Sequence, residues 1–405
     1  MAQILVAGGG IGGLATAMSV ARQGHRVLVL EGRSDFAELG AGIQLAPNAF
    51  HALDRLGVGD SVRARAVHID ELSLMDGTTG RRIAGLPLDD AYRRRFGNPY
   101  AVVRRVDLYA PLLQACRASS AVRLRTRARV LRYAQDDSGV TVELASGERI
   151  RGAALIGADG IHSAVRGQLV GDGGPRVSGH TIYRSVIPME AVPEELRWNT
   201  VTLWAGPDRH FVHYPIGNGR FLNLAATRDD GAAQEVTGTP VPRERVLAAF
   251  PGLGETPRRL LGLGEGWRSW VLCDRDPVRR WTDGRVVLVG DAAHPMLQYA
   301  AQGACQTLED AVVLGDLIGT EEADFERRFE EYADERLDRT AAAQRAAREM
   351  GSRLFHATGE AARRRDATLA ALSARDLRDR VAWLHGARAD ARADARGVRP
   401  AYVAG

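Results

Sequence analysis

The stretch QILVAGGGIGGLATA, residues 3–17, decides the fold, because a short apolar run leads directly into a glycine-rich turn and then a helical pattern. Gly8, Gly10 and Gly13 have the spacing at which missing side chains permit a tight turn, close approach of a pyrophosphate and close packing of helix on strand. The helix that follows, predicted over residues 11–23, presents free N–H groups and a partial positive charge to phosphates. The stretch therefore predicts the start of a dinucleotide-binding β-α-β unit.

A carboxylate at the end of the next strand narrows the choice of dinucleotide. Residues 25–30 alternate into a second strand that ends at Glu31. A carboxylate there accepts hydrogen bonds from ribose hydroxyls and repels a 2′-phosphate, so the pattern indicates FAD or NAD and not NADP. Arg33 is a further candidate for binding the cofactor. The alternative, a glycine-rich turn without a ligand, is disfavoured by the strand and helix on either side.

The composition is that of a globular protein and excludes several classes of function. The chain has 405 residues, of which 45% are hydrophobic and 26% charged, enough for two interlocked domains. A formal charge of +4 is too small for nucleic-acid binding, although basic residues that are all arginine suit small anionic ligands. Three cysteines without a CxxC pair encode neither a zinc site nor a dithiol centre. No apolar run reaches membrane-spanning length, so we expect a cytoplasmic protein with neither membrane nor nucleic acid as a partner.

A second motif far along the chain favours FAD over NAD. The stretch RVVLVGDAAH, residues 285–294, is a buried strand that ends in a Gly-Asp pair, and a helix is predicted from Gly303. Asp291 can hold a second diol, and the helix N-terminus can be aimed at an electron-rich ring. Two such elements far apart fit a long dinucleotide such as FAD, whereas a simple NAD dehydrogenase needs no second element.

A third motif, ALIGADGIHSAVR over residues 154–166, is a strand, a turn and a capped helix. Its polar and turn-forming members are Asp159, Gly160, Ser163 and Arg166. Taken alone, the motif also fits a helix N-cap followed by a surface arginine, with no role in binding.

In this order and spacing, the three motifs resemble the single-component aromatic-ring flavoprotein hydroxylases, the family that contains para-hydroxybenzoate hydroxylase and salicylate hydroxylase. The resemblance runs from about residue 3 to about residue 345. It implies a non-covalent FAD whose ADP half is held by Gly8, Gly10, Gly13 and Glu31.

The resemblance also assigns residues to the flavin half of the cofactor. By this match Arg105 approaches the flavin, and Asp159 lies where FAD and NAD(P)H binding meet. Asp291 binds hydroxyls on the ribityl side, and Pro295 and Gly303 flank the isoalloxazine ring. Because the chain has a single glycine-rich fingerprint, NAD(P)H is expected to dock transiently in a cleft, without a Rossmann domain of its own.

The expected fold is α/β, with a Rossmann-like FAD-binding domain, an interleaved β-sheet substrate domain and a C-terminal helical segment. The FAD-binding domain is discontinuous, and the expected boundaries are 1–75, 99–178 and 271–320 for it, 76–98 and 179–270 for the substrate sheet, and 321–405 for the helices. The stretch GARADARADARGVRP, residues 386–400, is predicted as surface helix or frayed terminus.

The segment HPMLQYAAQG, residues 294–303, most resembles the 3-hydroxybenzoate 6-hydroxylases and the nearby salicylate hydroxylase branch. On that match His213 and Gln298 are the catalytic candidates near the substrate hydroxyl, since histidine titrates near neutrality and can take a phenolic proton. A hydrogen-bonded strand histidine is an equal alternative for His213, and loop packing is one for Gln298. Trp204 and Tyr214 are candidates for the pocket wall or the core, and Tyr299 is a candidate for the pocket wall or, like Gln298, for packing of the loop.

The predicted function is hydroxylation of a small phenolic or aromatic acid with NAD(P)H and O2, through a C4a-hydroperoxyflavin, by a monomer or homodimer. Two other enzyme classes are open, a flavin halogenase and an NAD-dependent dehydrogenase, as is a non-catalytic flavin-binding protein. Halogenases carry a Trp-x-Trp-x-Ile-Pro segment, and WRSW at residues 267–270 has the wrong spacing. A dehydrogenase would be colourless and would consume no oxygen.

Overall fold

The computed structural model describes residues 2–37, 42–319 and 324–386. Of the C-terminal stretch 386–400, only Gly386 lies within these ranges, so the prediction for that stretch falls outside the described residues. Among the described residues, no helix is both long enough and apolar enough to cross a membrane.

A six-stranded, mainly parallel sheet forms around the glycine-rich turn, in the order β19-β20-β12-β1-β2-β8. Its strands are β1 (Gln3–Ala7), β2 (Arg26–Leu30), β8 (Val122–Arg125), β12 (Ala154–Gly157), β19 (Thr282–Asp283) and β20 (Val286–Leu288). Continuous apolar runs such as ILVA and VLVL suit parallel strands that are covered on both faces. Between β1 and β2 lies α1 (Ile11–Arg22), which packs against α5 (Arg105–Ala118) and α9 (Gly303–Ile318). The predicted Rossmann-like unit is confirmed.

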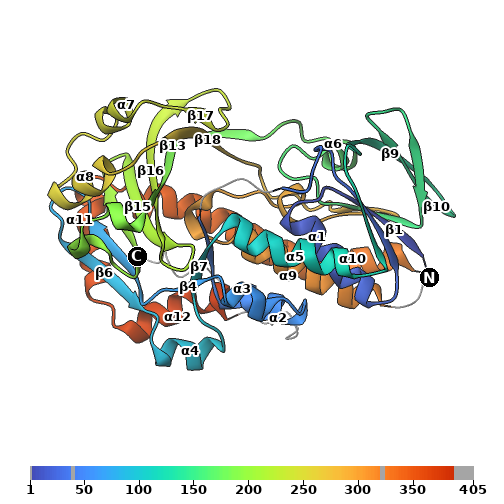
Figure 1. Cartoon of the computed structure of the whole chain (residues 1–405), viewed down its shortest axis with the longest axis horizontal. Helices are drawn as coiled ribbons and strands as arrows, with labels where there is room; N and C mark the ends of the chain where they lie inside the picture. Colours follow the sequence, from blue (N-terminus) through green and yellow to red (C-terminus); the bar gives the residue numbers. More distant parts are fainter. Residues whose placement is uncertain (1, 38–41, 320–323, 387–405) are drawn as a thin grey trace.

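An eight-stranded sheet forms the second half of the molecule, in the order β17-β18-β13-β16-β15-β14-β5-β6. Its strands are β5 (Glu71–Asp76), β6 (Arg82–Pro87), β13 (Arg176–Pro188), β14 (Thr200–Gly206), β15 (Arg209–Ile216), β16 (Phe221–Ala232), β17 (Thr239–Pro240) and β18 (Arg268–Asp274). One face packs into an apolar core with α7 (Arg243–Ala248) and α8 (Glu255–Gly262). The sheet lies at one end of the molecule and the parallel sheet at the other (Figure 1).

Smaller elements complete the two halves. Two three-stranded sheets have the orders β11-β10-β9 and β3-β7-β4. Their strands are β3 (Gly42–Leu45), β4 (Val67–His68), β7 (Ala101–Arg104), β9 (Val130–Asp136), β10 (Gly139–Leu144) and β11 (Arg149–Gly152). The remaining helices before the C-terminal segment are α2 (Pro47–Arg55), α3 (Gly59–Arg63), α4 (Asp90–Phe96), α6 (Ala164–Leu169) and the short turns η1 (Met189–Ala191), η2 (Glu194–Leu196), η3 (Gly290–Ala292) and η4 (Gln298–Ala300).

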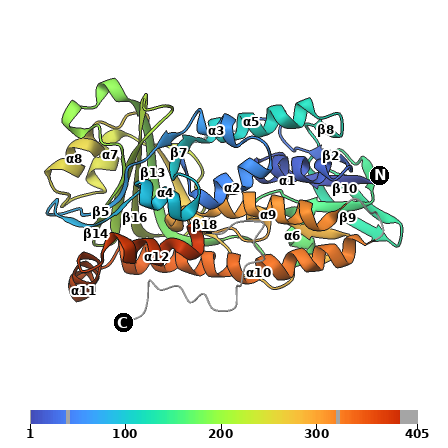
Figure 2. The same cartoon turned by 90° about the horizontal axis from the view of Figure 1, so that it is seen from below.

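The predicted C-terminal helical segment is confirmed. α10 (Phe325–Glu349) runs alongside α9 for much of the molecule's length (Figure 2) and ends in a π-helical turn, η5 (Met350–Phe355). α11 (Gly359–Ala370) and α12 (Ala374–His385) follow and pack against β6.

Two expected domain boundaries fall inside strands of the large sheet. The boundary between residues 75 and 76 cuts β5, which pairs with β14 and β6. The boundary between residues 270 and 271 cuts β18, which pairs with β13. In both cases the strand is recruited by partners far away in the chain, a contact that local sequence patterns do not contain.

Candidate active site

The glycine turn closes tightly on the end of β12. Gly8 has a φ of +99°, and a Cβ there would lie 2.4 Å from the carbonyl oxygen of Ala158. A Cβ on Gly13 would lie 2.0 Å from the carbonyl oxygen of Gly8, so α1 can pack on the turn only without that side chain. No side chain among the described residues caps α1, which begins after Gly10. Its first N–H groups therefore remain available to an anion.

The carboxylate at the end of β2 lies beside this turn. Glu31 accepts hydrogen bonds from the N–H groups of Gly9 and Arg33, each at 2.8 Å. A Cβ on Gly9 would lie 2.9 Å from the same carboxylate, so the absence of a side chain keeps this corner open. The arrangement is a cradle for a ribose and the phosphate next to it.

The third motif contains the predicted helix cap. Ser163 is the N-cap of α6, and its hydroxyl oxygen accepts a hydrogen bond from the N–H of Arg166 at 2.9 Å. Asp159 accepts a hydrogen bond from the N–H of Ala164 at 2.8 Å and another from the Ser163 hydroxyl. Two polar side chains thus satisfy the start of this short helix.

The arginine of the third motif is buried and links it to the second motif. Arg166 has 0% of its side chain exposed and pairs with Asp172 at 2.7 Å. It also donates to the carbonyl oxygens of Ala292 and Ala293, at 3.1 and 2.7 Å. The alternative of a surface arginine is therefore wrong: this side chain fixes the loop that carries Asp291.

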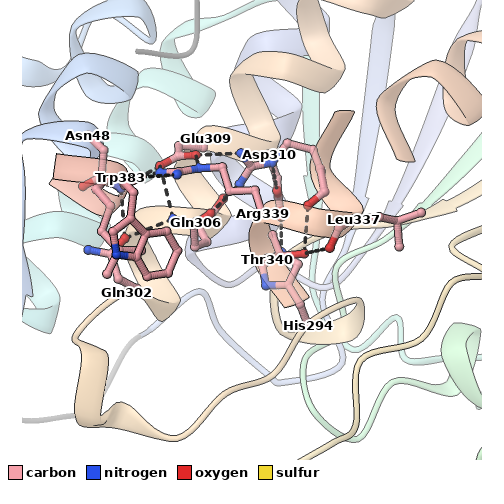
Figure 3. A network of polar contacts seen from close by, with 12 residues as sticks. Asn48, His294, Gln302, Gln306, Glu309, Asp310, Leu337, Arg339, Thr340 and Trp383 are labelled. Carbon is pink, nitrogen blue, oxygen red and sulfur yellow. Dashed lines mark hydrogen bonds and ion pairs between the residues drawn. The ribbon is translucent and has the colours of Figure 1, made fainter. Parts of the chain in front are cut away.

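A buried ionic network holds α9 against α10 (Figure 3). On α9, Glu309 pairs with Arg336 at 2.6 Å and with Arg339 at 2.7 Å, and Asp310 pairs with Arg336 at 2.7 Å. Burial alone would raise the pKa of Glu309, but the two guanidinium charges outweigh it and lower that pKa to about 2. Asp310 also accepts a hydrogen bond from the N–H of Gly290 at 2.9 Å. The network therefore sets the position of the cofactor loop as well as that of the helix.

The same network reaches the first turn of α9. The side-chain oxygen of Gln302 accepts hydrogen bonds from Asn48 and Gln306, each at 3.0 Å, and Asn48 donates to Glu309 at 2.6 Å (Figure 3). No side chain among the described residues caps α9. A second helix N-terminus is thus held rigidly, with its N–H groups unused by capping side chains.

All these elements open on one cavity of about 970 Å³. It extends from the glycine turn to the large sheet, and Glu31 and Asp291 both line it. The predicted site residues that line it are Gly8, Gly10, Glu31, Arg33, Arg105, Asp159, Tyr214, Asp291, Gln298, Tyr299 and Gly303.

Four predicted site residues do not line this cavity. Gly13 lies in the first turn of α1 and is buried against the carbonyl oxygen of Gly8, and the carbonyl oxygen of Pro295 accepts a hydrogen bond from Gln344 at 3.0 Å, within the core. Trp204 is 1% exposed and packs in the core behind the large sheet, as does His213. Trp204 is therefore not a wall of this cavity.

The expected position of His213 in the pocket is wrong. Its ring lies on the far face of β15, 6.2 Å from the ring of Trp204 and 5.7 Å from that of Phe211, measured between centroids. Among the described residues neither ring nitrogen has a hydrogen-bond partner. Burial lowers the pKa of His213 to about 3.

A different histidine of the same strand faces the cavity. His210, Val212 and Tyr214 all line it, since alternate residues of β15 point to the same face of the sheet. His210 and His213 are three positions apart and so must face opposite sides. The sequence HFVHYPI shows that one histidine faces the pocket but not which one, because the pattern does not reveal which face is covered.

The cavity wall also holds an arginine that the sequence analysis missed. Arg184 of β13 lines the cavity, donates to the side-chain oxygen of Gln298 and lies over the ring of Trp270, 5.8 Å from its centroid. Among the described residues the charged or titratable groups that act on it are Tyr214 and Arg105, and no carboxylate is among them. Burial lowers its pKa, which reflects the cost of keeping this charge away from water. The signal was a lone arginine in the strand pattern TIYRSVIPM.

Comparison with known proteins agrees with this geometry. The family model described as an FAD binding domain matches residues 1–347. The 3-hydroxybenzoate 6-hydroxylase 1 of Aquipseudomonas alcaligenes is 47% identical over 95% of this chain and 97% of that protein. A 3-amino-4-hydroxybenzoate 2-monooxygenase of Streptomyces platensis is 36% identical over 95% of this chain and 96% of that protein. The structure of a salicylate hydroxylase substrate complex has a TM-score of 0.83 and 26% identity, covering 98% of this chain and 97% of that one.

The chain belongs to the FAD-binding domain family, within which its relatives are aromatic-ring monooxygenases. FAD is its cofactor, with NAD(P)H as co-substrate. The residues present fit FAD. A Cβ at Gly8 would fill the glycine turn, so the missing side chain leaves space there for the cofactor. The N-termini of α1 and α9, which have no side-chain caps, open on the same cavity. The halogenase and dehydrogenase alternatives are not favoured.

Proposed function

We propose that this enzyme hydroxylates 3-hydroxybenzoate, or a phenolic benzoate closely like it, at the ring carbon para to the hydroxyl. The proposal rests on one observation: the side chains of His210, Gln298 and Arg184 line the same cofactor cavity. The 47% identical relative named as a 3-hydroxybenzoate 6-hydroxylase supports this choice of ring and position. Bound FAD, reduced by NAD(P)H, supplies activated oxygen to the ring; the residues of the chain bind, orient and deprotonate the substrate.

His210 is the proposed base in place of His213. It is 2% exposed, and burial lowers its pKa well below the usual value, so the ring is neutral at pH 7. A neutral imidazole can take the phenolic proton, and the phenolate then donates electron density to the ring carbon that is attacked.

Gln298 is proposed to donate, and not to accept, a hydrogen bond to the substrate. The guanidinium of Arg184 has only donors, so the side-chain oxygen of Gln298 must face it. The amide NH2 of Gln298 is then left for an oxygen atom of the ligand.

Arg184 is the proposed partner of the substrate carboxylate. Arg184 is directly opposite Ala225 on β16, which is opposite Val212 on β15, and His210 is two residues from Val212 on the same face. With strands about 4.8 Å apart and a rise of about 3.3 Å per residue along a strand, the Arg184 and His210 backbones are separated by about 12 Å diagonally across the sheet, over the side chains of Ala225 and Val212. An anion at Arg184 would offset the cost of burying that charge, as a bare phenol could not.

A substrate screen tests the proposal. Purified enzyme is given NADH or NADPH with 3-hydroxybenzoate, salicylate, 4-hydroxybenzoate or 3-amino-4-hydroxybenzoate, and NAD(P)H loss, oxygen uptake and product mass are followed together. We expect 2,5-dihydroxybenzoate from 3-hydroxybenzoate, in step with NAD(P)H loss. Hydroxylation of another acid but not of 3-hydroxybenzoate would overturn the choice of substrate.

Variants of the two histidines test the base. We expect His210→Ala to slow hydroxylation by about 100-fold or more while FAD reduction continues. The matched control is His213→Leu on the opposite face of the same strand, which should hydroxylate at the normal rate. Equal rates in His210→Ala and the unaltered enzyme would rule out His210 as the base.

A further inference from the structure

The end of α10 reaches the wall of the cavity. The helix changes there to the π-helical turn Met350–Phe355, a conformation that often marks functional sites. Three residues of this turn line the cavity: Met350, Leu354 and Phe355. The turn presses closely on η4, since a Cβ at Gly351 would lie 2.6 Å from the ring of Tyr299. His356, the next residue, is thereby placed directly behind the wall.

His356 contacts the proposed base. Its Nε2 lies 2.7 Å from Nδ1 of His210, and the two ring centroids are 5.0 Å apart. His210 is 2% exposed and His356 is 7% exposed, so water does not compete for this bond. With Nδ1 engaged, Nε2 is the nitrogen of His210 that is left for a ligand.

The hydrogen bond between the two rings contains one hydrogen atom, which either ring can supply. Burial lowers the pKa of His210 well below its usual value, and burial with the neighbouring His180 lowers that of His356 to about 4. Both rings are therefore neutral at pH 7. If His356 donates the bond, Nε2 of His210 carries the other hydrogen and cannot accept a proton; if His210 donates it, Nε2 has a free lone pair.

We propose that His356 is the positioning residue of His210: it accepts the hydrogen bond from Nδ1 and so keeps Nε2 ready to take the phenolic proton. Once the proton is taken, the cationic His210 donates a charge-assisted bond to His356, which is stronger than the neutral one and stabilises the product of the transfer. The inference rests on the proposed role of His210 as the base.

Other polar groups surround the pair without replacing His356. The hydroxyl of Tyr299 bonds to Nδ1 of His180, whose Nε2 lies 3.6 Å from Asp229, and the charge of Arg209 also acts on His356. Among the described residues, His210 is the hydrogen-bond partner of the His356 ring. If position 356 served packing alone, a phenyl ring would fill the same space between its aromatic neighbours.

Two substitutions separate positioning from packing. His356→Phe keeps a flat ring but removes the acceptor, and His356→Gln keeps an acceptor oxygen but cannot pass a proton on. The first readout needs no turnover: the ultraviolet difference spectrum of 3-hydroxybenzoate bound to the oxidised FAD enzyme gives its phenolate fraction from about pH 6 to about pH 9. The second is the rate of hydroxylation beside that of FAD reduction.

We expect His356→Phe to raise the apparent pKa of the bound phenol and to slow hydroxylation by about 10- to 100-fold, the size of loss found when the partner that orients a metal-ligating histidine is removed. The rate of FAD reduction should stay unchanged in His356→Phe. In His356→Gln the rate of hydroxylation should be within a few-fold of that of the unaltered enzyme. Normal phenolate formation in His356→Phe would overturn the proposal, and so would a His356→Gln enzyme as slow as the phenyl variant. Normal phenolate formation in His210→Ala would instead defeat the proposed base.

Discussion

His213 carries two ring nitrogens into an apolar core where, among the described residues, nothing bonds to them. A buried imidazole of this kind stays neutral because burial lowers its pKa to about 3. In the unfolded chain the same group titrates near its usual value of 6.5. Folding therefore excludes a proton that the unfolded chain binds in acid, and the group makes stability depend on pH.

Replacing His213 by leucine should flatten this dependence. Below about pH 6.5 the unfolded chain binds one more proton at this site than the folded chain, so the free energy of unfolding falls as pH falls. The loss approaches about 1.4 kcal/mol per pH unit and continues until the folded pKa of about 3 is reached. Urea unfolding at pH 7 and pH 5 measures it: the difference between the two values should shrink by about 2 kcal/mol in His213→Leu. If the difference between the free energies of unfolding at pH 7 and pH 5 were the same in His213→Leu and in the unaltered protein, the ring of His213 would be protonated in the folded protein as well.

The two histidines of β15 also show where prediction from sequence stops at this scale. The glycines, Glu31 and Asp291 could be assigned because their roles follow from local geometry, a turn or a strand end. A strand pattern, in contrast, gives the alternation of faces but not which face meets a ligand. His210 and Arg184 became visible only when the fold placed β13 and β15 over the cavity.

At the scale of elements, α9 connects the cofactor loop, the cavity and the C-terminal helix. The sequence predicted its start at Gly303, and the helix begins at that residue in the structure. Its interior carries Glu309 and Asp310 where an apolar face is expected, and their partners lie on α10, which sequence periodicity could not pair with them. The domain boundaries expected near β5 and β18 depend on long-range pairing in the same way, since both fall inside strands whose partners lie far along the chain.

Removal of Arg336 should lower the free energy of unfolding far more than removal of an exposed arginine. Arg336→Met leaves Glu309 and Asp310 buried with less compensation, and we expect a loss of about 3–5 kcal/mol in the free energy of unfolding. The matched control is Arg327→Met on the same helix, where the arginine is 52% exposed and pairs with Glu331; its loss should change the free energy of unfolding far less, because water screens an exposed pair. Denaturant titration compares the two, and equal losses would show that the network contributes little to stability.

At the scale of the whole molecule, the cofactor cavity joins elements from distant parts of the chain. Its walls come from the glycine turn near residue 8, the loop of Asp291 and the face of the large sheet. Residues of both halves line this cavity, so a ligand bound along it contacts both halves at once. A ligand that binds only the folded chain stabilises all of it, by about 2.7 kcal/mol at a hundred times its Kd.

Asp291→Ala should greatly reduce the stabilisation of the folded protein by FAD. The variant loses the carboxylate proposed to hold the ribityl-side hydroxyls, so we expect it to purify with much less FAD and to melt at a lower temperature. Added FAD should raise the Tm of the unaltered enzyme but hardly that of Asp291→Ala at the same concentration. Asp60→Ala serves as the control, because Asp60 is fully exposed and, within the part of the chain that the structure describes, its salt-bridge partner is Arg63, three residues along the same helix. A yellow Asp291→Ala protein with stoichiometric flavin would show that the contacts at the glycine turn and at α9 hold FAD without this carboxylate.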